Sequence, residues 1–214
     1  YDLVKDFTPI SLITSTPNIL FVHPAVAAAT LKDLIALAKS KPGVLNYASG
    51  STGGTSHLAG ELFNLMAGIK IVRIPYKSGS QQTVDLLGGQ VQMQFNTLDG
   101  YQDHLKSGRL RALAVGSAKP STLLPDVPTL DATLPGFESV VILGMFAPAG
   151  TPLSVVRRLS QEVAHSISSE ESRTRLRAIA VEPVASSPEA LAAAVKAEVD
   201  RFGRLIRELG IGSQ

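Results

Sequence analysis

The stretch VLNYASGSTGGTSHLAGELFNLM, residues 44–66, changes from a strand pattern to a helix pattern across a single loop. Val44 to Ala48 has the short apolar run that is typical of a strand. The loop from Ser49 to Ser56 contains only Ser, Thr and Gly, and the helix that follows it is expected to end at Gly68. The stretch therefore predicts a strand, a Gly-rich loop and a helix in direct succession.

The helix after this loop has a candidate N-cap residue and an apolar stripe. Thr55 or Ser56 is suited to its N-cap, because a hydroxyl oxygen can accept a hydrogen bond from a backbone N–H of the first turn. Apolar residues at helical spacing predict one buried stripe: Leu58, Leu62 and Leu65. An earlier helix has a clearer start, since Thr30 with Asp33 has the sequence pattern of a capping box.

The alternation of strand and helix patterns continues from residue 71 to residue 115. The expected elements are a strand at Ile71–Tyr76, a helix at Ser80–Leu87, a strand at Val91–Phe95, a short helix at Tyr101–Lys106 and a strand at Leu110–Val115. This β-α-β-α rhythm predicts an α/β fold with a mainly parallel sheet, helices on both faces and right-handed crossovers.

The rest of the chain offers many helices but few strands. Four prolines break residues 118–137 into an irregular connection. Strands are expected only at Ile10–Ile13, Ile19–Val22 and Val140–Phe146, whereas the chain after Thr151 has helical spacing almost throughout. These helices have apolar faces and too little sheet to cover them. We therefore expect either a dimer through this end or a domain of which part is missing.

The composition indicates an ordinary globular protein and excludes some classes of partner. Apolar residues make up 44% and charged residues 18%, the net charge is only +2, and the basic residues form no run. Aromatic residues, at 5%, are too few for a base-stacking surface, so we expect no nucleic-acid partner. Cysteine is absent, which removes disulfides, thiol nucleophiles and thiolate metal sites.

No membrane span or secretory signal is visible in the sequence. The best apolar run, Val140 to Pro148, is only as long as a strand. The opening residues Tyr1 to Lys5 include no initiating Met and no apolar core. We interpret the sequence as a processed chain or an internal piece of a longer one.

The search for catalytic and cofactor motifs is negative. The sequence contains no Gly-x-Ser-x-Gly elbow, no phosphate-binding P-loop and no dinucleotide pattern. The histidines are scattered and none belongs to a zincin motif: His23, His57, His104 and His165. We therefore predict no catalytic residue, no metal and no cofactor. A hydrolase that uses Ser51 with His57 is the enzymatic alternative, although no acid that would orient His57 can be named.

The loop from Ser49 to Ser56 is the strongest candidate for a binding site. Between a strand and a helix, it presents unpaired backbone N–H groups and the positive end of the helix dipole, where an anion binds without a cationic side chain. Its hydroxyls add donors and its glycines let a ligand approach the backbone: Ser49, Gly50, Ser51, Thr52, Gly53, Thr55 and Ser56. The alternative is an ordinary polar loop. His57, in the first helical turn, either contacts the ligand or lies on the surface.

Two later strand ends offer further candidates at the same edge of the sheet. Tyr76 is suited to lie along an aliphatic ligand, Lys77 supplies charge or is a solvated loop lysine, and Ser80 would cap the next helix. Asn96 and Thr97, after the following strand, are able to bond a carboxylate or a hydroxyl. Three successive junctions therefore favour a small carboxylate ligand.

The segment Tyr47 to Ala59, YASGSTGGTSHLA, resembles the signature loop of the tripartite tricarboxylate transporter substrate-binding proteins, the Bug family. Other phrases agree with this family in the same order: DFTPI (6–10), PN (17–18), VRIPYK (72–77), DLLGGQV (85–91), LRALAV (110–115), LPDVPT (124–129) and FAPAGTP (146–152). The likeness runs essentially from one end of the chain to the other.

The resemblance implies a periplasmic solute-binding protein of the type II, Venus flytrap kind, with two lobes of mainly parallel sheet flanked by helices. It implies residues 23–141 as the second, ligand-binding lobe and residues 1–22 with 142–214 as the first. It also implies that the protein captures a di- or tricarboxylate or a similar organic acid and hands it to the subunits of a membrane transporter. The ligand contacts that carry over are Ser49–Ser56, Tyr76–Ser80 and Asn96.

The resemblance also implies that the first lobe is incomplete. Members of the family open with a strand and a Pro/Gly-rich loop that form half of the site, and this sequence begins after them. Loss of about two hydrogen bonds to a charged group, at roughly 1.5–3 kcal/mol each, corresponds to about two to four decades of affinity. We therefore predict weak binding by this chain. A protein that senses a ligand and signals to a membrane partner is the alternative to a transport receptor, and the sequence does not fix the acid.

Overall fold

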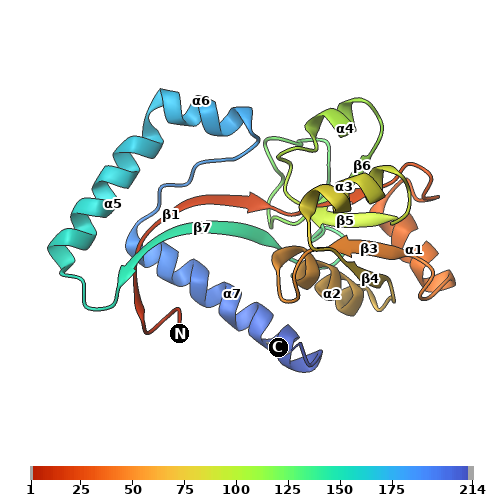
Figure 1. The fold of residues 1–214 in the computed structure, drawn as a ribbon, viewed down its shortest axis with the longest axis horizontal. Helices are drawn as coiled ribbons and strands as arrows, with labels where there is room; N and C mark the ends of the chain where they lie inside the picture. The colour runs from red at the N-terminus through yellow and green to blue at the C-terminus, as the bar shows by residue number, and fades with distance from the viewer. Residues whose placement is uncertain (1, 212–214) are drawn as a thin grey trace. The chain divides into compact units, whose positions relative to one another are not determined.

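The chain folds into two compact units, which its computed structural model describes over residues 2–211 (Figure 1). The first unit comprises Tyr1–Thr16 with Val141–Arg204, and the second comprises Pro17–Val140 with Leu205–Gln214. From the sequence, residues 17–22 were expected to belong to the first unit. In the structure they belong to the second unit, where Ile19–Val22 forms the fourth strand along the sheet.

The second unit is built on a five-stranded sheet in the order β4-β3-β5-β2-β6. Its strands are β2 (Ile19–Val22), β3 (Asn46–Ser49), β4 (Val72–Pro75), β5 (Met93–Asn96) and β6 (Arg111–Val115). Strand β3 is parallel to β4 and β5, whereas β2 is antiparallel to both of its neighbours, β5 and β6. All strands except β2 therefore share one direction, which confirms the predicted α/β fold with a mainly parallel sheet.

Four helices connect these strands: α1 (Leu31–Ser40), α2 (Thr55–Ala67), α3 (Gly79–Leu87) and α4 (Gln102–Lys106). Helix α1 begins with the predicted capping box, in which the Thr30 hydroxyl accepts from the Asp33 N–H and the Asp33 carboxylate accepts from the Thr30 N–H. The Asp33 pKa is lowered by the hydrogen bonds from Thr30. Helix α2 ends as predicted, with Gly68 in the left-handed conformation at φ 60°.

Three expectations about helices α2 and α3 were wrong. The N-cap of α2 is Gly54, without a side-chain bond, because the Ser56 hydroxyl accepts the Gly50 N–H instead. The N-cap of α3 is Ser78, so Ser80 already lies inside the helix. Leu65 is 50% exposed, since the buried face of α2 is centred on Ala59 and Phe63 and Leu65 lies on its flank.

The two faces of the sheet carry different cores. Phe95 of β5 lies between Phe63 of α2 and Phe137, with ring centroids 5.9 and 6.2 Å away. Because side chains alternate along a strand, Gln94 points to the opposite face. There Phe21 of β2 stacks on Tyr101 at 4.6 Å, and Gln94 meets polar groups of α3. Helices therefore cover both faces as predicted, one over an apolar layer and one over a layer with buried polar groups.

Three backbone segments meet closely where the chain enters and leaves the second unit. The Asn18 N–H donates to the Ser139 carbonyl at 3.0 Å, the Gly116 N–H to the Asn18 carbonyl at 2.7 Å, and the Ser139 N–H to the Gly116 carbonyl at 2.8 Å. A Cβ at Gly116 would lie 2.5 Å from the Ser139 carbonyl oxygen. Only glycine fits this crossing.

The first unit has much less sheet. Strands β1 (Phe7–Pro17) and β7 (Val140–Pro148) form a two-stranded sheet and run side by side in Figure 1. The unit's helices are α5 (Leu153–Ser168), α6 (Glu170–Ala178) and the part of α7 (Pro188–Glu208) up to Arg204. Leu12 packs on Leu191 and Val195. Several apolar side chains of this unit stay exposed, in line with the expected shortage of sheet: Leu143, Leu153, Val155, Ile179 and Val199.

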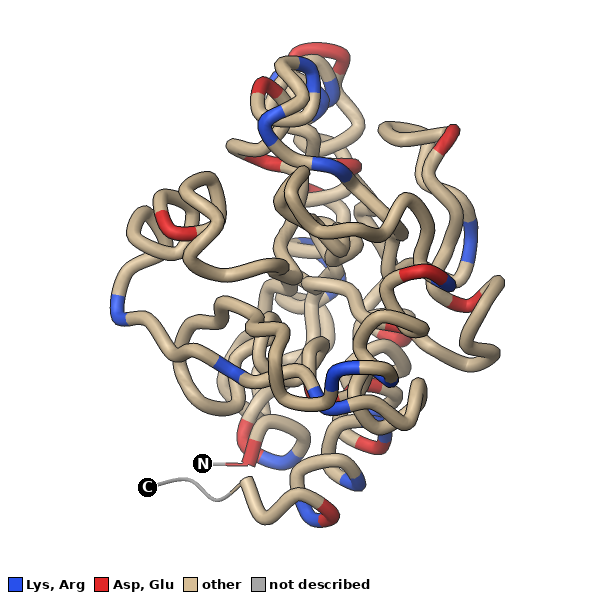
Figure 2. The backbone as a smooth tube through the Cα atoms, turned by 90° about the vertical axis from the view of Figure 1, so that its right-hand side faces the viewer, with Lys and Arg blue, Asp and Glu red and all other residues tan. Residues whose placement is uncertain are grey.

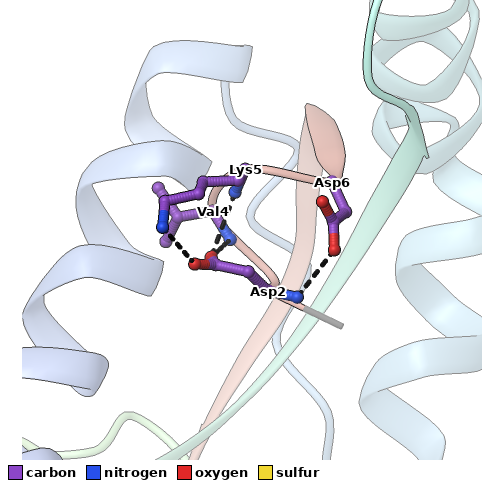
Figure 3. Close-up of polar contacts among 4 residues, drawn as sticks. All are labelled: Asp2, Val4, Lys5 and Asp6. Carbon is purple, nitrogen blue, oxygen red and sulfur yellow. Dashed lines mark hydrogen bonds and ion pairs between the residues drawn. The ribbon is translucent and has the colours of Figure 1, made fainter.

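A small turn precedes β1 (Figure 3). The Asp2 carboxylate accepts hydrogen bonds from the backbone N–H groups of Val4 and Lys5 at 3.0 and 3.1 Å, and the Lys5 ammonium lies 3.2 Å from it. The Asp2 N–H donates to Asp6 at 2.7 Å. The interaction with Lys5 holds the Asp2 pKa below its ordinary value. These bonds fix the direction in which the chain enters β1.

Charged residues of both signs are mixed along the backbone (Figure 2). Several are paired one helical turn apart, as Arg158 is with Glu162 and Arg175 with Glu171. Over residues 2–211, none of the helices combines the length and the apolar character that crossing a membrane requires. The same residues contain no group of three His, Cys, Asp or Glu side chains placed to hold a metal ion.

Candidate anion-binding site

The carboxyl ends of β3, β5 and β4 lie at one edge of the sheet of the second unit, because these strands are parallel. Ser49 pairs with Pro75 in the register of β3 and β4, and the Tyr76 N–H donates to the Ser49 carbonyl at 2.9 Å. Asn96 ends β5 at the same edge. The structure therefore brings together the three strand ends from which the sequence predicted ligand contacts.

Backbone N–H groups are available in the first junction, which runs from Ser49 into α2. Three of its glycine N–H groups are used inside the loop: Gly50 donates to the Ser56 hydroxyl, Gly53 to His57 Nδ1 and Gly54 to the Ser51 carbonyl. Five other N–H groups meet no acceptor among residues 2–211, and they belong to Ser51, Thr52, Thr55, Ser56 and His57. The last three are in the first turn of α2, where the helix dipole is positive.

The side chains of this loop differ in exposure. Ser51, Thr52, Gly53 and Thr55 are exposed, and Ser56 is half-buried. Ser49 is fully buried, so it lies beneath the loop rather than on its outer surface. The exposed hydroxyls and free N–H groups together form a surface that donates hydrogen bonds.

Arg73 of β4 holds this loop from below, a role that the sequence analysis missed. Its Nε donates to the Ser49 hydroxyl at 2.6 Å, one terminal nitrogen to the Gly50 carbonyl at 2.8 Å and the other to the Thr52 hydroxyl at 3.1 Å. Arg73 lies opposite Tyr47 in the register of the two strands, which places it under the loop. Its cation adds to the positive potential of the α2 N-terminus.

His57 is a second internal support of the loop. It is 5% exposed, so it does not lie on the surface, and its Nδ1 accepts the Gly53 N–H at 2.9 Å. Burial lowers the His57 pKa, the nearby Arg73 cation lowers it further, and Glu61 acts in the opposite direction. The ring is therefore neutral at pH 7 and carries its proton on Nε2.

The second junction, from Tyr76 into α3, is simpler. The Tyr76 hydroxyl donates to Asp85 at 2.8 Å. Partial burial and, second to it, this bond raise the pKa of Tyr76 to about 12. Lys77 is exposed and forms no ion pair within residues 2–211. Ser78 and Ser80 share a hydrogen bond at 2.6 Å. The first-turn N–H groups of α3, from Gly79 to Gln81, meet no acceptor among the described residues.

The side chains at the third strand end already form hydrogen bonds within the protein. Asn96 Oδ1 accepts the Thr97 N–H at 2.9 Å, and Asn96 Nδ2 donates to the Tyr101 hydroxyl at 3.1 Å. The Thr97 hydroxyl donates to Asp99. Asn96 is therefore tied to the polar layer under α3, and only its second Nδ2 hydrogen remains for a ligand.

The arrangement can bind an anion but offers no activated nucleophile. Two helix N-termini direct free N–H groups from one sheet edge, and hydroxyls surround the first of them. A Ser51–His57 pair would need a ring nitrogen of His57 that accepts a proton, but Nδ1 already accepts the Gly53 N–H. The geometry thus supports binding and gives no support to the hydrolase alternative.

Residues 1–211 match the tripartite tricarboxylate transporter family receptor, TctC. The chain belongs to this family. The match confirms the resemblance found in the sequence, and proteins of this family are periplasmic solute-binding proteins rather than enzymes. The prediction that this is a binding protein thus agrees with its family.

Individual relatives support the same family assignment. The protein BugT of Bordetella pertussis is 32% identical over 98% of this chain and 65% of its own length. A solved structure of Rpa4515 from R. palustris with adipate is 35% identical, with a TM-score of 0.85 over 99% of this chain and 71% of its own. MatC from Rhodopseudomonas palustris with bound malate is 28% identical, with a TM-score of 0.82 over 96% of this chain and 71% of its own.

The chain is shorter than its relatives. It spans 62% and 65% of the length of two curated relatives that match it over nearly its whole length. These relatives therefore contain chain that has no counterpart in residues 1–214.

Proposed function

We propose that this protein is an extracytoplasmic receptor that binds a small organic acid through the N–H groups of its sheet edge. The acid is a dicarboxylate, a tricarboxylate or a similar carboxylate, and the first junction, Ser49–Ser56, holds one carboxylate. The second junction and Asn96 contribute further donors. The acid is held between two lobes and is then delivered to a membrane transporter of the tripartite tricarboxylate type.

The free N–H groups of Ser51, Thr52, Thr55 and Ser56 are the observation on which this proposal mainly depends. Backbone donors that meet no acceptor are satisfied by water or by a ligand, and at a helix N-terminus they prefer negative charge. Solved relatives carry adipate and malate, both dicarboxylates. The chemistry of the site and the chemistry of these ligands agree.

An NMR titration tests the proposal. Uniformly ¹⁵N-labelled protein is titrated with adipate and, separately, with malate, and the backbone amide signals are followed. We expect saturable shifts of the signals from Ser51, Thr52, Thr55 and Ser56, with smaller shifts at Gly79 to Gln81. The method detects weak as well as tight binding, so the weak binding predicted from the sequence does not prevent the measurement.

The control ligand is 1,6-hexanediol, which has the carbon chain of adipate without its charges. It should leave these signals in place, because neutral hydroxyls gain little from a helix N-terminus. A folded protein whose loop signals respond to neither acid, or respond equally to the diol, would contradict the proposal.

Membership of the family supports two further proposals, on the location and on the partner. We propose a periplasmic location, to be checked by cell fractionation of the parent strain. We also propose that the ligand-loaded protein contacts the membrane subunits of the transporter, to be checked by crosslinking in membranes with identification of the captured subunits. The predicted dimer stays a prediction, and light scattering measures it directly.

A further inference from the structure

A chain of buried polar groups lies under the first junction, between the sheet and helices α3 and α4. Gln94 of β5 is fully buried and Gln82 of α3 is 7% exposed, and Gln94 Nε2 donates to Gln82 Oε1 at 2.7 Å. The Tyr101 hydroxyl donates to Gln94 Oε1 at 3.0 Å, and Tyr101 itself is 4% exposed. Buried polar groups of this kind are costly unless they are all bonded, so their arrangement is informative.

The hydrogen bonds in this chain run in one direction. It begins at Asn96, whose Oδ1 accepts a backbone N–H, so that its Nδ2 faces the Tyr101 hydroxyl. The Tyr101 hydroxyl donates a hydrogen bond to Gln94 Oε1, and Gln94 Nε2 donates in turn to Gln82. Because the oxygen of Gln82 is used as the acceptor, its Nε2 group is left as a donor at the end of the chain.

This last donor, Gln82 Nε2, meets no acceptor in the part of the chain that the structure describes. The residue is only 7% exposed, but Nε2 itself keeps contact with solvent, so it is accessible to a ligand. The atom lies next to the first junction, 3.6 Å from the point where a Cβ on Gly50 would stand. Gly50 has no positive φ, and a Cβ there would meet no other atom within 4 Å. The backbone therefore does not require glycine at this position, and the missing side chain leaves open the space in front of Gln82.

We propose that Gln82 is a further ligand-contacting residue, whose Nε2 donates to the carboxylate held by the Ser49–Ser56 loop. This inference rests on the proposed function. The oriented chain from Asn96 to Gln82 makes the amide present hydrogen rather than oxygen, which suits a site of positive potential. Tyr101 and Gln94 are positioning residues in this scheme, and Gly50 keeps the approach open.

The side-chain NH₂ signals of Gln82 give a direct test in the adipate titration. We expect them to shift with the same saturation curve as the amide signals of Ser51 and Thr52, while the side-chain NH₂ signals of Gln81 stay in place. Gln81 is the matched control, because it is the adjacent glutamine of the same helix and is exposed. If adipate shifts the loop amides and leaves the Gln82 NH₂ signals unmoved, the inference is overturned and the proposed function stands.

Two variants test the contact between Gln82 and the ligand in different ways. Gln82→Leu removes the amide, and we expect it to weaken adipate binding about tenfold, the effect of one hydrogen bond to a charged group. Gly50→Ala leaves the buried chain intact but fills the space in front of Gln82, and a similar loss is expected without loss of thermal stability. Gln90→Leu, at an exposed glutamine outside the site, should bind adipate as the unmodified protein does.

The outcomes separate the two claims. Absence of adipate binding by the unmodified protein contradicts the proposed function itself. Binding by the unmodified protein that both Gln82→Leu and Gly50→Ala retain in full contradicts only the role of Gln82. Should Gln82→Leu unfold, Gly50→Ala and the Gln82 NH₂ signals still decide the question.

Discussion

The two strand-to-helix junctions that contribute most to the site are built in different ways. The first, Ser49–Ser56, is fixed from beneath by Arg73 and from within by His57 and Ser56. The second, Tyr76–Ser80, is short and mostly exposed, and within residues 2–211 its side-chain ties are the Tyr76–Asp85 and Ser78–Ser80 bonds and a bond from the Thr83 hydroxyl to the Gly79 carbonyl. Both present free N–H groups at a helix start. Only the first has these groups preorganised, so we expect it to supply most of the affinity and the second to adapt to the ligand.

The helices behind the two junctions provide the strongest contrast. A Cβ on Gly60 of α2 would lie 2.4 Å from the ring of Tyr47, which is fully buried and donates to Glu61 at 2.5 Å. Gly60→Ala should therefore lower the free energy of unfolding by about 3 kcal/mol, the upper range for overpacking a core. Urea denaturation followed by circular dichroism measures the change.

The matched variant is Gly79→Ala in α3, where an added Cβ meets no atom within 4 Å. It should leave the stability unchanged or raise it by up to about 1 kcal/mol, because alanine is the better helix former. Equal losses in the two variants would show that the close packing behind the first junction is not what distinguishes it.

The cations at the two junctions give the next largest difference. Arg73→Met keeps much of the side-chain length but removes three hydrogen bonds to the loop, and we expect it to cost about 2 kcal/mol of stability. Hydrogen exchange of the Gly50, Gly53 and Gly54 amides, which are hydrogen-bonded inside the loop, should become faster in this variant. Lys77→Met, at the exposed junction, should change the stability by less than about 0.5 kcal/mol. If the Arg73→Met protein is as stable as the natural protein and its exchange is unchanged, Arg73 does not hold the first junction in place.

The first junction should also respond to pH, and the second should not. His57 has a pKa below the value of about 6.5 that it has in the unfolded chain. The unfolded state therefore takes up a proton first as the pH falls, so stability is full above about pH 6.5 and declines below it. Thermal unfolding of the natural protein and of His57→Gln between pH 7.5 and pH 5 tests this. The natural protein should lose more stability, and parallel curves would speak against a neutral, buried His57.

The smallest effect is expected at the second junction. Tyr76→Phe removes the bond from the hydroxyl to Asp85, which is half-exposed and should contribute only about 0.5 kcal/mol. The variant should also lose a phenol whose pKa is about 12, which an absorbance titration detects. A loss as large as that of Arg73→Met would mean that the second junction is as firmly built as the first.

The sequence predicted the alternation of elements and the three strand ends but not the internal supports of the site. The hydrophobic patterns mark β3, α2 and β5 because burial alternates with their own periods. Which hydroxyl caps a helix is a matter of local competition, and Ser56 bonds Gly50 rather than its own helix. Arg73 reaches the loop only through the register of β3 and β4, which a sequence does not state.

The buried glutamines were missed for a related reason. Gln82 and Gln94 lie in an amphipathic helix and an alternating strand, where a polar residue ordinarily faces water. Their burial depends on α3 and α4 covering the second face of the sheet. The exposed apolar residues of the first unit, by contrast, were expected, because a shortage of strands can be counted in a sequence.

The antiparallel strand β2 has a consequence for synthesis on the ribosome. All four of its residues are buried, yet its partners, β5 and β6, are made more than 70 residues later. Until those partners emerge, Ile19–Val22 is an apolar segment with unpaired edges, the kind of sequence that aggregates or is held by chaperones. Closure of this sheet is therefore a late, long-range event that requires the chain up to Val115.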